Sequence, residues 1–280
     1  MTTNQNPNGR MFLKKKLLIT LGAVVGVVAI VVTSVLGTLA YLTSSAAVSN
    51  VFTIGNVGIV MTESKVNPDG TLFDGGATQV DTNTYHLLPG KTYIKNPVIT
   101  VNAGSTASYL FVLLRNDLEK IAWNDTEHPS IAQQMADNGW AKYTKASTGW
   151  VYVFVGFNED GTSKVPSENV ALETLESFES GKVSGLSAEF VEATKTNYRD
   201  QDGNRVEDKA GKYALFENFS IKTNADVSTY GAAKVTLTAV AIQADGFTSD
   251  EPGTENAKTA LDKAWEAVFA TYPYIHTGGN

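Results

Sequence analysis

Apolar residues follow strand-like patterns through the middle and the end of the chain. Segments 109–114 and 151–155 are apolar at nearly every position, which is typical of central strands covered on both faces. In segment 235–243 apolar and polar residues alternate at first, and both faces become apolar from Ala239. We therefore expect a strand with one solvent-exposed face at its start and both faces buried at its end. Three shorter segments are also predicted to be strands: 93–101, 140–144 and 215–222.

Turn signals separate these strands. Pro89 and Gly90 stand at the two central positions that a type II turn favours, and segment 102–105 has a second turn pattern around Gly104. Several short strands at close spacing, without alternation of strands and helices, favour an all-β fold, either a β-sandwich or a jelly roll.

Two regions depart from the strand pattern. Segment 167–211 is polar, with Leu172, Leu175 and Phe178 at helical spacing, and we interpret it as a loop-rich surface insertion. Near the C-terminus, apolar residues within 257–269 form one stripe at helical spacing. We predict a helix that packs on the sandwich, with Trp265 as its largest contact; a partner-binding role for the stripe is the alternative.

The first forty residues have the layout of an export signal. Arg10 and Lys14 to Lys16 precede an apolar run over 17–42, and no acidic residue occurs before position 41. Thr38 and Ala40 are small residues in the positions that a signal peptidase reads, so we predict cleavage before Tyr41. The run is also long enough to cross a bilayer, which leaves an uncleaved membrane anchor as the alternative. The predicted organisation is a signal peptide over 1–40 and a single domain over 41–280.

The apolar phase changes shortly after this junction. Phe52 and Ile54 share one strand face, whereas Val57 and the alternate residues after it share the other. Gly55 and Asn56 lie between the two patterns and predict a bulge or a hinge. This arrangement allows segments 41–54 and 57–61 to pair in different sheets.

Charge and composition narrow the class of protein. The 280 residues include 22 basic and 29 acidic side chains, a net charge of −7, and removal of the four basic residues within 1–40 takes it to about −11. We see no basic patch of the kind that nucleic acid requires, so nucleic acid is not an expected partner. The chain has no cysteine, so an exported domain would depend on its core and not on disulfides.

Candidate chemistry is sparse. The three histidines, His86, His128 and His276, occur in unrelated contexts, and no HExxH, GxSxG or phosphate-binding glycine motif is present. Segment 200–204 spaces oxygen ligands as calcium loops do, but its glycine comes too early and the twelfth-position glutamate is missing, so we interpret it as a hairpin turn. The sequence predicts no catalytic residue, no metal and no cofactor, with a metal site assembled from distant residues as the alternative.

The order of these features resembles a known family. The carrying segments are Thr38-Leu-Ala-Tyr41, Asn50-Val-Phe-Thr-Ile-Gly-Asn-Val-Gly-Ile59, Leu88-Pro-Gly-Lys91, 98–115, and 235–247 with its Ala-Ile-Gln-Ala-Asp-Gly-Phe ending. They resemble the TasA/camelysin family of exported Gram-positive proteins that the signal peptidase SipW processes, and in particular its BsaA-like biofilm-matrix branch. Segment 167–211 departs from the family pattern.

The resemblance implies a secreted structural protein with a jelly-roll domain, which assembles outside the cell into biofilm-matrix fibres. In such fibres the segment freed by signal cleavage inserts into the next subunit, which here would be segment 41–54, with Val51, Phe52 and Ile54 as the inserted side chains. The implied partners are other copies of the chain, the signal peptidase during export, and an accessory matrix protein.

Three other interpretations stay open at this point. Phe52 and Ile54 would begin the first strand of their own domain if no strand is donated. A cell-surface adhesin or binding module, anchored by 17–42, is a second alternative. A camelysin-type secreted protease is the third, although no motif in this sequence supports it.

Overall fold

The computed structural model describes residues 43–44, 49–102, 104–146, 149–172, 187–188, 190–191, 211–253 and 257–271. Packing divides the chain into two compact units, Met1–Thr43 and Ser44–Asn280, and every described residue except Thr43 belongs to the second. This second unit is mostly β-sheet with few helices, as the strand patterns predict, and is consistent with an all-β sandwich. The expected signal helix within 1–40 lies outside the described residues.

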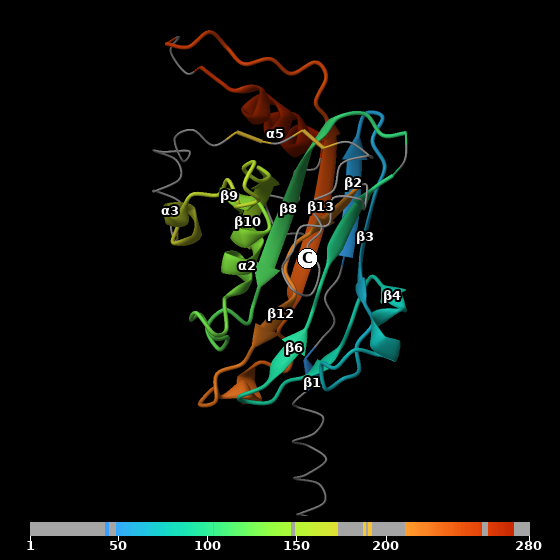
Figure 1. Cartoon of the computed structure of the whole chain (residues 1–280), viewed down its shortest axis with the longest axis vertical. Coiled ribbons are helices and arrows are strands. Elements are labelled where there is room, and N and C mark those ends of the chain that lie inside the picture. Colours follow the sequence, from blue (N-terminus) through green and yellow to red (C-terminus); the bar gives the residue numbers. More distant parts are fainter. Residues whose placement is uncertain are drawn as a thin grey trace, which may run out of the picture. The chain divides into compact units, whose positions relative to one another are not determined.

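A five-stranded sheet forms one layer of the second unit (Figure 1). In spatial order its strands are β2 (Ser49–Ile54), β13 (Val235–Gln243), β8 (Ser108–Asn116), β10 (Gly149–Phe154) and β9 (Trp140–Ala146). All neighbours in this sheet are antiparallel except β2 and β13, which are parallel. The strands predicted at 109–114, 140–144, 151–155 and 235–243 are confirmed as β8, β9, β10 and β13. As expected, β13 changes from alternating to continuous burial along its length.

A second sheet contains β11 (Lys212–Ala214), β7 (Val98–Val101), β3 (Ile59–Ser64) and β4 (Gln79–Val80). Near it, β12 (Asn218–Ser220) pairs with β6 (Thr92–Ile94). The remaining described strands are β1 (Thr43–Ser44) and β5 (Tyr85–His86).

Two predicted strands are wrong as continuous elements. Segment 93–101 is split into β6 and β7, and of segment 215–222 only β12 is a strand. The break in the first segment includes Pro97, which has no amide proton for a ladder, and Lys95, whose side chain turns into the interior. The break lets β6 pair with β12 while β7 pairs with β3 and β11.

Aromatic side chains connect the two sheets. The Trp140 indole nitrogen on β9 donates to Ala214 O on β11 at 2.8 Å, and the ring of Phe154 on β10 lies 5.1 Å from the Tyr213 ring in an edge-on arrangement. These three aromatic residues are fully buried. The contacts therefore form an interior between the layers, as in a sandwich.

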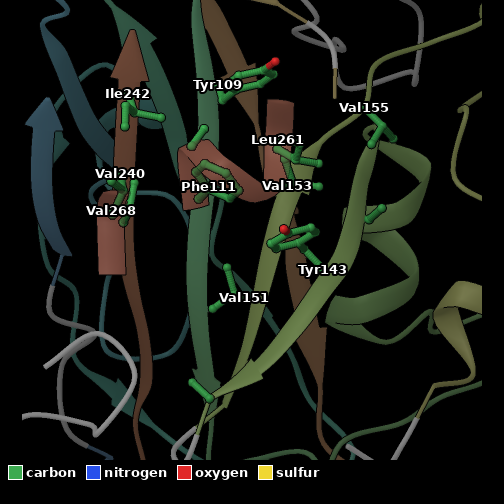
Figure 2. Close-up of a cluster of buried hydrophobic side chains, with 13 residues drawn as sticks. Tyr109, Phe111, Tyr143, Val151, Val153, Val155, Val240, Ile242, Leu261 and Val268 are labelled. Carbon is green, nitrogen blue, oxygen red and sulfur yellow. The ribbon is translucent and has the colours of Figure 1, made fainter. Parts of the chain in front are cut away.

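The C-terminal helix α5 (Ala260–Thr271) packs against the five-stranded sheet. Figure 2 shows its Leu261 and Val268 in one cluster with Phe111, Val153 and other residues of the sheet. Trp265 adds a tilted ring contact to Phe111, with 5.0 Å between ring centroids. The predicted packing of the C-terminal stripe on the sandwich is confirmed.

The other described helices are short. The sequence patterns did not predict α2 (Ile131–Asp137), whereas α3 (Ser167–Val170) opens the expected insertion. Two 3-10 turns are η1 (Asp74–Gly76) and η2 (Val227–Thr229). Leu175 and Phe178 of the predicted helical patch, and the turn at 200–204, lie outside the described residues.

A buried ion pair lies beside the second sheet. Lys95 Nζ is 2.7 Å from Glu63 Oε2, and each side chain is 2% exposed. Asn83 Nδ2 donates to the other carboxylate oxygen of Glu63 at 2.9 Å. Burial lowers the pKa of Lys95, and the neighbouring Glu63 carboxylate acts in the opposite direction. The pair is enclosed and has a structural role.

Candidate functional site

The segment that the sequence singles out for assembly forms an edge of the five-stranded sheet. β2 pairs with β13 over six positions, from Ser49 opposite Leu237 to Ile54 opposite Ile242. It is the outermost strand on its side of the sheet as the structure describes it (Figure 1). Because β2 and β13 are parallel and far apart in the sequence, no tight turn fixes their register.

The three expected donor residues all lie on β2. Val51 is half-buried opposite Ala239, and Phe52 stands opposite Val240. Ile54 is half-buried and packs against the core cluster that β13 shares with α5. These residues therefore complete the sheet of their own subunit. This is the arrangement expected if no strand is donated, and exchange of the strand between subunits stays a prediction.

Gly55 and Asn56 form the exit from β2. Gly55 has φ +87°, and a Cβ atom there would lie 2.6 Å from Gln243 Cβ, so both the backbone and the space favour glycine. The Asn56 amide donates to Gln243 Oε1 at 3.1 Å, and its carbonyl accepts from the Thr106 amide at 3.0 Å.

This short polar junction redirects the chain. Val57 is buried directly after it, and β3 then begins in the second sheet. The two segments on either side of Gly55 therefore belong to different sheets, as the change of apolar phase allows. Whether the junction acts as a hinge stays a prediction.

At the opposite edge of the same sheet, a side chain pairs with the backbone of one residue of β9. Asn169 on α3 accepts from the Lys142 amide at 2.7 Å and donates to the Lys142 carbonyl at 2.9 Å. Asn169 is 1% exposed and occupies the place that a neighbouring strand would take beside β9. Sequence patterns gave no signal for this contact, because a single asparagine in a polar loop has no periodicity to mark its partner.

The other residues selected from the sequence are dispersed. His86 is exposed on β5, and His128 lies in a loop with its Nδ1 3.3 Å from Asp125 Oδ1. His276, Thr38, Ala40 and Tyr41 lie outside the described residues.

Among the residues that the structure does describe, no group of three or more histidine, cysteine, aspartate or glutamate side chains is arranged to hold a metal ion. The helices within those same residues are all too short or too polar to cross a membrane.

Two loops repeat one self-contained arrangement. In Asn-Pro-Asp-Gly-Thr at 67–71, the Thr71 hydroxyl donates to Asp69 at 2.6 Å; in Asn-Glu-Asp-Gly-Thr at 158–162, Thr162 donates to Asp160 at the same distance. These hydroxyl bonds, and the amide bonds beside them, hold the pKa of each aspartate below its ordinary value. The polar atoms serve the turns themselves, so the loops are structural.

Comparison with known proteins adds no relative. No protein-family model, no curated protein and no solved structure matches this chain.

Proposed function

We propose that this protein is a secreted structural subunit of an extracellular biofilm matrix, and that it polymerises into fibres by donating β2 to a neighbouring copy. The position of β2 is the observation that carries the proposal. Among the strands that the structure describes, β2 is an edge strand that pairs with β13 alone, and no hairpin connects the two. Another copy can therefore supply the same six residues without altering any other strand pair.

The junction and the closed edge give this exchange a direction. Gly55 and Asn56 separate β2 from β3, so β2 can swing away while the second sheet stays intact. Asn169 already satisfies the amide and the carbonyl of Lys142 on β9, which disfavours strand addition at that position. One donating end and one accepting edge per subunit give a head-to-tail contact, and repetition of such a contact produces an open filament.

The proposal includes signal cleavage during export. Cleavage between Ala40 and Tyr41 by a SipW-type signal peptidase of a Gram-positive bacterium would release the segment that leads into β2. The sandwich would be of the jelly-roll kind, and an accessory matrix protein would be a further partner. No catalytic role is proposed.

A designed cross-link tests the exchange. Val51 and Ala239 are register partners across β2 and β13, and neighbouring strands are about 4.8 Å apart, within the range that a disulfide spans. The chain has no cysteine of its own, so Val51→Cys/Ala239→Cys introduces the only two thiols. Fibres of this variant are oxidised after assembly and separated on a denaturing, non-reducing gel.

The gel distinguishes the two arrangements. Donation places the introduced thiol on β2 of one copy beside the introduced thiol on β13 of the next, so covalent multimers in a ladder are expected, and reduction should collapse them to monomer. Each single-cysteine variant is the control and should form no ladder beyond dimer. Fibres that yield only internally linked monomer would contradict strand donation, and the absence of fibres from the unmodified secreted protein would contradict the proposed function.

A further inference from the structure

A groove of about 1000 Å³ lies beside the end of β9 and the start of β10, on the side of the sheet away from β2. Trp150 and Tyr152 of β10 line it and alternate with Val151 and Val153, which belong to the core cluster. Side chains alternate along a strand, so the two aromatic residues lie on the other face of β10 from Val151 and Val153, and Trp150 also packs against the core cluster. Residues of α2, α3 and the segment around Lys222 form the remaining walls.

The groove is basic although the chain is acidic. Four lysines line it, Lys120, Lys142, Lys145 and Lys222, and Glu119 is the one acidic side chain among the described lining residues. The lining therefore carries a net charge of about +3, against −7 for the whole chain. A positive groove in an otherwise negative protein attracts anionic ligands.

The lysines are arranged around an indole ring. Lys142 Nζ lies 4.9 Å from the Trp150 ring centroid and Lys145 Nζ lies 5.3 Å from it. Lys142 also donates to Val170 O at 2.8 Å and to Leu172 O at 2.6 Å, so it holds the wall formed by α3. Lys145 is half-buried and Lys120 is exposed.

The composition of the groove indicates a sugar polymer. Trp150 and Trp123 are half-buried rings in the lining, and Trp123 also stacks on His128 with 5.7 Å between ring centroids. The Asn124 amide, and the amide atoms of Asn116 and Gln133 that are not bonded to Leu118 and Asp137, can hydrogen-bond the hydroxyl groups of a carbohydrate. A peptide strand would need an open sheet edge, and at the adjacent edge of β9 Asn169 already occupies the amide and carbonyl of Lys142. We propose that this groove binds an anionic polysaccharide carrying carboxylate groups. β2 and Gly55 do not line the groove, so this site is independent of the proposed strand donation.

Three polymers test the proposal on the full chain, kept in solution with a mild non-ionic detergent. Polygalacturonate carries sugar rings and carboxylates, its methyl ester keeps the rings without the charge, and poly-L-glutamate keeps the charge without the rings. Binding is measured by affinity electrophoresis at low salt. The proposal expects polygalacturonate to bind at least about tenfold more tightly than either of the others, because both rings and charge are recognised.

A charge-matched pair of variants locates the site. Lys120→Glu/Lys145→Glu is expected to weaken polygalacturonate binding at least about tenfold through charge reversal in the groove. Lys164→Glu/Lys212→Glu changes two exposed lysines outside the groove by the same total charge and should leave binding within about twofold. Thermal unfolding of both variants shows that each is folded.

Trp150→Leu tests the ring contact, and it should weaken polygalacturonate binding more than poly-L-glutamate binding. Equal binding of polygalacturonate and poly-L-glutamate would overturn the sugar ligand in favour of any polyanion, an acidic protein included. Equal weakening by the two lysine pairs would overturn the groove as the binding site.

Discussion

The Tyr143 hydroxyl on β9 donates a 2.6 Å hydrogen bond to Asp262 Oδ1 in the first turn of α5. The same carboxylate accepts the Thr259 amide at 2.9 Å, while the Asp262 amide donates to the Thr259 hydroxyl at 3.2 Å. This reciprocal pair is a capping box, so one buried aspartate both starts the helix and attaches it to the sheet.

Tyr143→Phe should therefore destabilise the domain. Removing the hydroxyl leaves part of a buried carboxylate without its donor, which costs about 1–3 kcal/mol. The measurement is the free energy of unfolding in denaturant. Tyr230→Phe removes a hydroxyl from a half-buried tyrosine in the η2 region and serves as the control, with an expected change within about 0.5 kcal/mol. Equal losses for the two variants would show that the bond to Asp262 contributes little.

The buried tyrosines predict a loss of stability at alkaline pH. Burial raises the pKa of Tyr85, Tyr143 and Tyr152 above the ordinary value of 10.0. In the unfolded chain these phenols ionise near pH 10, whereas the folded protein keeps them protonated. Their contribution to stability is therefore fully present below about pH 10 and is lost as the pH rises above it.

Unfolding free energies measured at steps from about pH 8 to about pH 11 should show this decline. Tyr143→Phe should make the decline shallower, because one of the tyrosines with a raised pKa is gone. A stability that stays constant through pH 10 and above would contradict the expected shift.

The Lys95–Glu63 pair predicts a large effect of a single substitution. Lys95→Met leaves the Glu63 carboxylate buried without its cation, at a cost of about 3–5 kcal/mol. The double variant Lys95→Met/Glu63→Leu should recover most of this loss, since Asn83 keeps its bond to the Ser64 carbonyl. Chemical denaturation of the parent, Lys95→Met, Glu63→Leu and the double variant forms a double-mutant cycle. A double variant no more stable than Lys95→Met would show that the unpaired charge is not the cause.

Asn169→Ala should open the protected edge of β9. The Lys142 amide and carbonyl would both lose their partner, with an expected destabilisation of about 1–3 kcal/mol. The free edge should also promote association between copies, measurable by sedimentation velocity of the internally cross-linked Val51→Cys/Ala239→Cys monomer, in which β2 cannot leave its own sheet. Asn158→Ala, in an exposed loop, is the control and should change neither property strongly. An Asn169→Ala protein that unfolds at the same denaturant concentration as the parent would contradict a capping role.

Local sequence patterns were sufficient to predict the strands and the helix whose burial is visible in consecutive residues. β8, β10 and β13 are apolar runs long enough to be recognised without knowing their neighbours, and the α5 stripe shows helical spacing around Leu261 and Val268. The change of phase at Gly55 likewise marked the point where the chain leaves one sheet for the other. In these cases the local sequence itself records burial, as a continuous apolar run in β8 and β10 and as a helical period in α5.

Tertiary structure decided what depends on contacts between distant residues. The break between β6 and β7 arises where Lys95 meets Glu63, the β9 edge is closed by an asparagine 27 residues away, and the lysines of the groove come from separate segments. None of these residues has a periodic pattern, because each is a single polar side chain whose partner is chosen by the packing of the sheets. The sequence determined the strands and the C-terminal helix, and only their packing determined which edge is closed, which strand lies outermost and where positive charge collects.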